Sequence, residues 1–124
     1  MKTKQLSICC LVSALLTGCA PRVPAPPVTV SNPSNEERVL FQKSIINSLK
    51  DPDSAKFGEQ IFLVDNKAAC VEVNAKNSYG GYTGFQQAMF VKVNGVGWKL
   101  MRIANVSPEV CINVLHSTII NQNL

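Results

Sequence analysis

The sequence has little charge and almost no histidine, and both shortages exclude classes of function. Of its 124 residues, 16% are charged and one is a histidine. Twelve Lys and Arg against eight Asp and Glu leave no dense basic stripe of the kind that contacts a phosphate backbone, so we expect no nucleic-acid partner. The length fits one small domain and excludes a multidomain enzyme.

The sequence patterns of metal sites and of nucleophilic catalysis are also missing. There is no Cys-x-x-Cys and no nucleophile elbow, and the glycine spacing matches no nucleotide-binding fingerprint. The one histidine, His116, is expected on the side of a helix that faces solvent. Asp51 and Asp53 flank Pro52, which is typical of turn and capping groups rather than of an acid/base pair. We therefore expect no catalytic residue, no metal and no cofactor.

The start of the chain has the pattern of an export signal. Lys2 and Lys4 precede a mostly apolar run over residues 6–16, which is shorter than the roughly 20 residues that a membrane-spanning helix needs. The run ends in Leu-Thr-Gly-Cys at Cys19, and this string resembles the lipobox of bacterial lipoproteins. The resemblance implies that residues 1–18 are removed and that acyl chains on Cys19 hold the protein on the bilayer. A retained transmembrane helix and an ordinary secretory signal are the alternatives.

The segment after Cys19 indicates which membrane is used and how far the domain lies from it. No Asp follows Cys19, and among lipoproteins this favours the outer membrane, with the domain facing the periplasm. Residues 19–34 are expected to form a tether, because residues 20–35 contain five prolines and show neither helical nor strand periodicity. At about 3.1 Å per residue in the polyproline II form, the tether would reach roughly 45 Å.

Residues 35–124 predict an α+β domain with a helix at each end. Asn35 is the expected N-cap of a first helix that ends near Lys50. The apolar residues of its inner face are spaced by four: Phe41, Ile45 and Leu49. Apolar and β-branched runs indicate strands at 61–64, 69–73, 85–93 and 96–103. We expect these runs to form a small antiparallel sheet of three to four strands.

Turn and capping residues define the end of the domain. Asn94-Gly95 lies between the last two expected strands, and this dipeptide favours the positive φ angles of a two-residue hairpin turn. Ser107 and Pro108 are expected at the N-cap and the first position of a C-terminal helix. One apolar stripe follows on this helix: Val110, Cys111, Val114, Leu115, Thr118 and Ile119.

Two cysteines fall inside the expected domain. Cys70 lies in a predicted strand and Cys111 in the first turn of the last helix. Two thiols in an exported domain are typical of a disulfide, which here would close about 40 residues and contribute roughly 4 kcal/mol to stability. The alternative is a reactive or metal-binding pair, but that reading has no Cys-x-x-Cys to support it.

The segment at residues 74–85 is the candidate binding loop. It contains both tyrosines of the chain, three glycines and no acid. Glycines permit unusual backbone angles, and exposed aromatic rings give a large contact area, as in recognition loops. Alternatively, the tyrosines fold back over the sheet edge and cover the core. The candidate contact residues are Asn74, Lys76, Asn77, Tyr79, Tyr82 and Phe85.

Two stretches of the domain carry a family resemblance. The first is DPDSAKF at residues 51–57, and the second is CVEVNAKNSYGGYTGF at residues 70–85. Together they resemble a recurrent pattern in small, largely uncharacterised lipoproteins and exported proteins of proteobacteria and their prophages. The resemblance implies one family and a shared domain, and it implies no activity.

These patterns predict a non-catalytic interaction module of the cell envelope. Its expected partners are the bilayer, through Cys19, and a protein of a secretion, conjugation or surface-exclusion assembly. The sheet face around Trp98 is a further contact candidate, although a tryptophan there is more typical of a core. The alternative function is an inhibitor of a cell-wall hydrolase such as lysozyme. An inhibitor needs an acidic patch, a module needs exposed loop aromatics, and an enzyme needs a cleft around His116.

Overall fold

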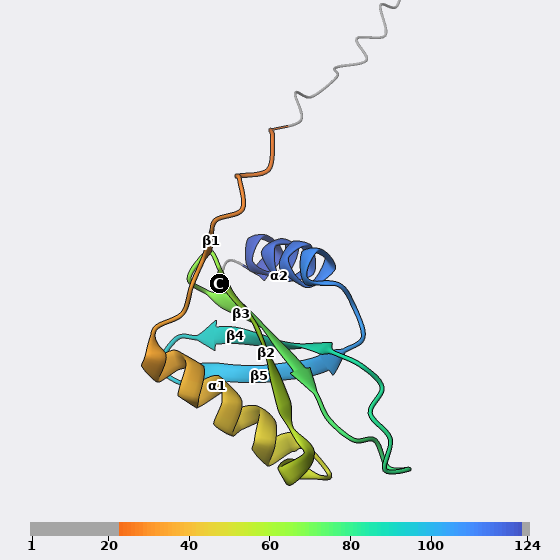
Figure 1. Ribbon diagram of the computed structural model, residues 1–124. Helices are drawn as coiled ribbons and strands as arrows, with labels where there is room; N and C mark the ends of the chain where they lie inside the picture. Colours follow the sequence, from red (N-terminus) through yellow and green to blue (C-terminus); the bar gives the residue numbers. More distant parts are fainter. Residues whose placement is uncertain (1–22, 123–124) are drawn as a thin grey trace, which may run out of the picture.

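The computed structural model describes residues 23–122, so the predicted signal peptide and Cys19 lie outside the described residues. A short strand and a helix come first, four consecutive strands follow a 3-10 turn, and a second helix ends the described chain (Figure 1). Their bounds are β1 Val30–Ser31, α1 Asn35–Ser48, the 3-10 turn η1 Pro52–Ser54, β2 Lys56–Val64, β3 Ala68–Asn74, β4 Gln86–Val93, β5 Gly97–Ala104 and α2 Pro108–Gln122. None of the helices in this part of the chain has the length and apolar character to cross a membrane.

The strands form one antiparallel sheet in the order β1-β2-β3-β4-β5, so every strand pairs with its neighbours in sequence. The predicted α+β class is confirmed, but the sheet has five strands rather than three to four. The additional strand is β1, in which Val30 and Ser31 pair with Val64 and Leu63. Two residues are too few to show the alternation by which a strand is predicted. The folded part of the chain therefore begins before the predicted boundary at residue 35.

The two helices cover opposite faces of the sheet (Figure 1). Phe41 of α1 packs on one face, and Leu115 of α2 packs on the other. Because successive side chains of a strand point to opposite faces, Val71 joins the α1 side and Cys70 the α2 side. The central strands are therefore buried on both faces, which explains their nearly continuous apolar sequence.

Helix α1 begins with a capping box and not with the predicted Asn35 cap. Ser34 Oγ accepts a hydrogen bond from the Glu37 N–H at 3.2 Å, and Glu37 Oε2 accepts one from the Ser34 N–H at 3.0 Å. This reciprocal pair satisfies two backbone donors, whereas an Asn35 cap would satisfy one. The helix ends at Ser48, two residues before the predicted end at Lys50.

Strand β2 begins five residues earlier than the predicted strand 61–64. Its pairing with β3 shifts register between Phe57 and Ile61, so the strand contains a bulge. A Cβ on Gly58 would lie 1.9 Å from Glu72 Oε2, so a glycine leaves room for this side chain. The polar residues of the bulge interrupt the alternation, and the sequence therefore predicted only the second half of the strand.

The hairpin between β4 and β5 has a longer turn than predicted. Val93 pairs with Gly97, so the turn contains three residues, 94–96. Gly95 adopts a φ of +77°, but Asn94 is not among the residues with positive φ. The predicted two-residue turn at Asn94-Gly95 is therefore wrong.

The turn between β2 and β3 also contains three residues, 65–67, because Val64 pairs with Ala68, but its first two residues adopt the positive φ angles that were predicted for Asn94-Gly95. Asp65 and Asn66 both have positive φ, at 51° and 52°, and the Lys67 N–H donates to the Val64 carbonyl at 3.0 Å. Positive φ at both central residues is the geometry that matches the twist of two antiparallel strands. This turn fixes the position of the Asp65 side chain.

The predicted disulfide is confirmed. Cys70 of β3 and Cys111 of α2 are bonded, with their Cα atoms 6.2 Å apart, and both are fully buried. Helix α2 starts as predicted, since the Ser107 hydroxyl accepts from the Val110 N–H at 3.4 Å and Pro108 is the first helical residue. The bond therefore joins the start of the last helix to the middle of the sheet.

Candidate functional site

The candidate loop projects from the end of the sheet between β3 and β4 (Figure 1). It contains a small hairpin of its own, in which Lys76 pairs with Tyr82. A three-residue turn, 78–80, closes this hairpin, and Gly80 adopts a φ of +81°. Glycine is the usual residue at the left-handed position of such a turn, because it has no Cβ to clash with the backbone.

Asn77 organises the tip of the loop. Its Oδ1 accepts hydrogen bonds from the Tyr79 N–H at 2.9 Å and the Gly81 N–H at 3.2 Å. Its backbone N–H donates to the Gly81 carbonyl at 2.9 Å, and its carbonyl accepts from the Gly80 N–H at 3.0 Å. The predicted contact residue Asn77 thus uses its side chain to fix the loop backbone.

Tyr82 is folded back onto the domain. Its hydroxyl donates to the Ser54 carbonyl at 3.0 Å, and the Lys56 and Lys76 ammonium groups lie 4.4 Å and 5.8 Å from the ring centroid. The backbone N–H of Lys76 also donates to Ser54 Oγ at 3.0 Å. Two of the predicted contact residues therefore anchor the base of the loop to η1.

Tyr79 has the opposite environment. Its side chain is 97% exposed at the tip of the loop, and Phe85 at the end of the loop is also exposed. The neighbouring residue Ser78 accepts a hydrogen bond from Lys50 Nζ at 2.9 Å, which adds a further tie between the loop and the domain. Tyr79 therefore has the exposure that a contact residue requires, whereas Tyr82 is 41% exposed and hydrogen-bonded back onto the domain.

Two further contact candidates from sequence, Asn74 and Trp98, lie in strands of the sheet and not in the projecting loop. Asn74 is the last residue of β3, and its Oδ1 is buried without a hydrogen-bond partner among the described residues. The Trp98 ring packs edge-on against Phe41 of α1, with ring centroids 5.0 Å apart. Helix α1 thus packs against the sheet face around Trp98, and the core interpretation of this residue is confirmed.

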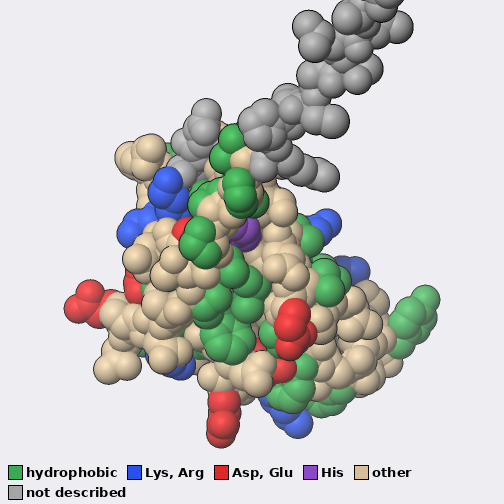
Figure 2. Space-filling model, turned by 90° about the horizontal axis from the view of Figure 1, so that it is seen from above, with side chains coloured by type: hydrophobic (Ala, Val, Ile, Leu, Met, Phe, Trp, Pro, Cys, Tyr) green, Lys and Arg blue, Asp and Glu red, His purple; other side chains and the backbone are tan. Residues whose placement is uncertain are grey.

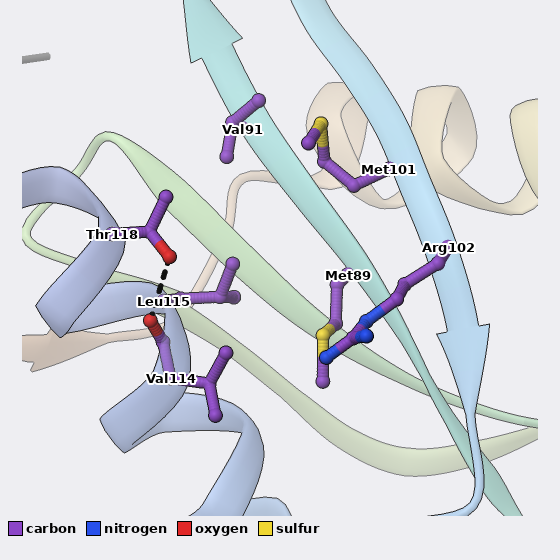
Figure 3. A pocket seen from close by; sticks show the side chains of 7 residues that line it. All are labelled: Met89, Val91, Met101, Arg102, Val114, Leu115 and Thr118. Atoms are coloured by element: carbon purple, nitrogen blue, oxygen red, sulfur yellow. Dashed lines mark hydrogen bonds between the residues drawn. The ribbon is translucent and has the colours of Figure 1, made fainter. Parts of the chain in front are cut away.

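A groove of about 230 Å³ lies between α2 and the strands β4 and β5 (Figure 3). Val114 and Thr118, predicted as part of the buried stripe of α2, line this groove instead. The lining residues are Met89, Val91, Met101, Arg102, Val114, Leu115 and Thr118. On this side of the molecule hydrophobic side chains gather at the surface (Figure 2). The sequence predicted the apolar stripe of α2. It could not show that part of this stripe faces a groove whose other side is formed by β4 and β5.

His116 is held between two partners, so its predicted place on a solvent-facing side is wrong. Its Nδ1 lies 2.6 Å from Asp65 Oδ2, and its Nε2 lies 3.0 Å from the Pro26 carbonyl oxygen. The side chain is 15% exposed. In a catalytic triad the second ring nitrogen faces a hydroxyl or thiol. Here it faces a backbone carbonyl, which provides no nucleophile.

The contact between His116 and Asp65 shifts the pKa of both groups. The hydrogen bond to Asp65 raises the pKa of His116 above its ordinary value, against a smaller lowering by burial, and the Pro26 carbonyl adds to the rise. Burial alone would raise the pKa of Asp65, but hydrogen bonds from the Thr29 N–H and from His116 lower it overall. Both shifts favour the charged pair.

Comparison with known protein families, with curated proteins and with solved structures finds no match to this chain. The family resemblance of residues 51–57 and 70–85 therefore stays a prediction. Within residues 23–122 there is no group of three or more His, Cys, Asp and Glu that could hold a metal ion. The fold defines a disulfide-linked α+β domain, and its candidate site is the ordered loop around Tyr79.

Proposed function

We propose that this chain is a membrane-anchored, non-catalytic interaction module of the cell envelope, and that residues 75–85 form its contact surface. The observation that carries the proposal is the 97% exposure of Tyr79 on a loop whose backbone is hydrogen-bonded. An exposed ring adds no packing to the isolated domain. At an interface, the same ring would bury a large apolar area with few rotatable bonds.

The internal hydrogen bonds of the loop support binding through a preformed surface. A disordered loop loses about 1–2 kcal/mol of backbone entropy per residue when it is ordered. Asn77 and the turn at Gly80 already hold the backbone around Tyr79, so a partner would not have to order it. Affinity would then depend on the ring and on the groups around it.

The loop lies at the opposite end of the domain from the N-terminal segment (Figure 1), and this position supports contact with a partner on the side away from the membrane. The string Leu-Thr-Gly-Cys at Cys19 is the basis for the proposed lipid anchor. A domain anchored through the N-terminal segment would direct Tyr79 away from the bilayer. We propose the periplasmic face of the outer membrane as the location and an envelope protein as the partner.

A photo-crosslinking amino acid at the position of Tyr79 tests the proposal in the cells that produce the protein. The matched control carries the same amino acid at Val96, which is 75% exposed in the β4–β5 turn. We expect a protein adduct from the Tyr79 position and none from the Val96 position. Adducts of equal yield at both positions, or no adduct at Tyr79, would contradict the proposed contact surface.

A hydrolase inhibitor is the second candidate function, because a projecting, ordered loop suits insertion into a cleft. The loop has no acid, and three lysines lie at its base or tip: Lys50, Lys56 and Lys76. These cations oppose binding to a basic lysozyme. Addition of the purified protein to a lysozyme assay is expected to leave the rate unchanged. Inhibition that is lost with Tyr79→Ala would favour this second function.

A further inference from the structure

The N-terminal segment contacts the domain at two points before β1 begins. At Thr29, the backbone N–H donates to Asp65 Oδ1 at 2.8 Å, and the Asp65 N–H donates to the Thr29 carbonyl at 2.8 Å. At Pro26, the carbonyl lies 3.0 Å from His116 Nε2. His116 Nδ1 in turn contacts the second carboxylate oxygen of Asp65. Two elements therefore bind the N-terminal segment: the β2–β3 turn through Asp65 and α2 through His116.

The two contacts of the His116 ring require two protons. The carboxylate of Asp65 and the carbonyl of Pro26 are both acceptors, so each ring nitrogen must donate. A neutral imidazole has one N–H. The carboxylate is the stronger acceptor and would keep it, which leaves a lone pair on Nε2 against the Pro26 oxygen. The Pro26 contact therefore exists only while the ring is charged.

We propose that His116 is a proton-controlled clamp, which holds residues 23–28 against α2 when protonated and releases them when neutral. Thr29 would stay bound, because its two hydrogen bonds to Asp65 involve no histidine proton. Release frees the three residues 26–28, which adds up to roughly 10 Å to the free part of the N-terminal segment at about 3.1 Å per residue. The clamp rests on this geometry and does not depend on the proposed function or on a lipid anchor.

Few charges surround the clamp. Asp65 faces the ring directly, and Lys67 of the same turn interacts with Asp65. The segment 23–29 has no charged residue, and the only other titratable residue of α2 is Glu109 in its first turn. Lys67 lowers the pKa of Asp65, which keeps the carboxylate charged. Asp65 is therefore the group that determines when His116 releases its proton.

The direction of the pKa shifts sets the pH range of the clamp. The pKa of His116 is raised above 6.5, so the clamp is fully formed below that value and is lost as the pH rises through the folded pKa. The pKa of Asp65 is lowered below 3.8, so the carboxylate is lost only in strong acid. The segment should be held at mildly acidic pH and free at alkaline pH.

Nitrogen NMR of the full chain in detergent micelles tests the clamp directly. The chain has one histidine, so ¹⁵N-histidine labelling reports on His116 alone. We expect two protonated ring nitrogens at pH 6 and a midpoint above 6.5. The heteronuclear NOE of the Val23, Ala25 and Val28 amides should fall with the same midpoint, while that of Thr29 stays high. A ring that is neutral at pH 6, or NOE values that do not change through the titration, would overturn the proposal.

Two variants separate the clamp from general loosening of the domain. His116→Gln has no proton to lose in this range, so residues 23–28 should be mobile at every pH. Asn113→Ala changes an exposed residue of the same helix and should keep the wild-type midpoint. A pH-dependent NOE in His116→Gln would show that another group controls the segment, and would also overturn the proposal.

Discussion

Tyr79 and Tyr82 are three positions apart, and their surroundings differ because one belongs to a turn and the other to a pair of strands. Tyr82 pairs with Lys76, which directs its ring over the loop base and its hydroxyl to Ser54. Tyr79 lies in the turn, where no neighbouring strand covers it. Composition could identify this loop, but only the register of its hairpin decides which ring is free.

Removal of one hydroxyl should distinguish the two rings. Tyr82→Phe should lower the free energy of unfolding by about 1 kcal/mol, because the Ser54 carbonyl would lose its donor. Tyr79→Phe should leave it unchanged, since no side-chain contact of Tyr79 stabilises the domain. Urea unfolding of both variants measures the difference. Equal losses for both variants would mean that Tyr79 also packs on the domain in solution.

His116 shows why some site residues could not be predicted. Periodicity correctly placed it away from the buried stripe of α2, but its partners lie far away in sequence. Asp65 is 51 residues and Pro26 is 90 residues from it. Ser107 and Pro108 were predicted correctly because capping depends on residues within one turn of a helix. The sequence therefore indicated the start of α2, but it could not indicate polar contacts between residues this far apart in the chain.

At the scale of elements, turn length was harder to predict than strand position. Asn94-Gly95 has the composition of a two-residue turn, but Gly97 after it also adopts a positive φ, of +93°, and the pairing starts one residue later. Asp65 and Asn66 adopt two successive positive φ angles without a glycine, in a turn that also contains three residues, 65–67. The preference of a dipeptide does not predict the length of a turn when the register of the two flanking strands determines that length.

The disulfide is the strongest link between elements. Replacement of Cys70 and Cys111 by Ser together should lower the free energy of unfolding by about 4 kcal/mol, because the closed loop spans a sequence separation of 41 residues. Thermal melts of the oxidised wild type and the double variant measure this loss. Reduced wild type serves as the control and should melt near the variant. An unchanged melting temperature, or free thiols in the oxidised protein, would contradict the disulfide.

At the scale of the whole molecule, the proposed anchor and the proposed contact surface lie at opposite ends. Cys19→Ala should remove the acyl chains, so the protein should leave the detergent phase in a partitioning experiment. The Cys70–Cys111 bond should persist in this variant, since neither cysteine belongs to the N-terminal segment, and a thiol assay checks it. Partitioning identical to that of the wild type would contradict the lipid anchor and leave the His116 clamp untouched.

The disulfide also bounds the exposed loop. Residues 75–85 lie between Cys70 and Cys111, and this loop projects beyond the ends of β3 and β4 in Figure 1. A protease that cut beside Tyr79 would produce two fragments that remain joined through the two sulfur atoms. The part that carries α1 would stay attached to the part that carries α2. A chain cleaved at the proposed contact loop would therefore persist as one covalent molecule.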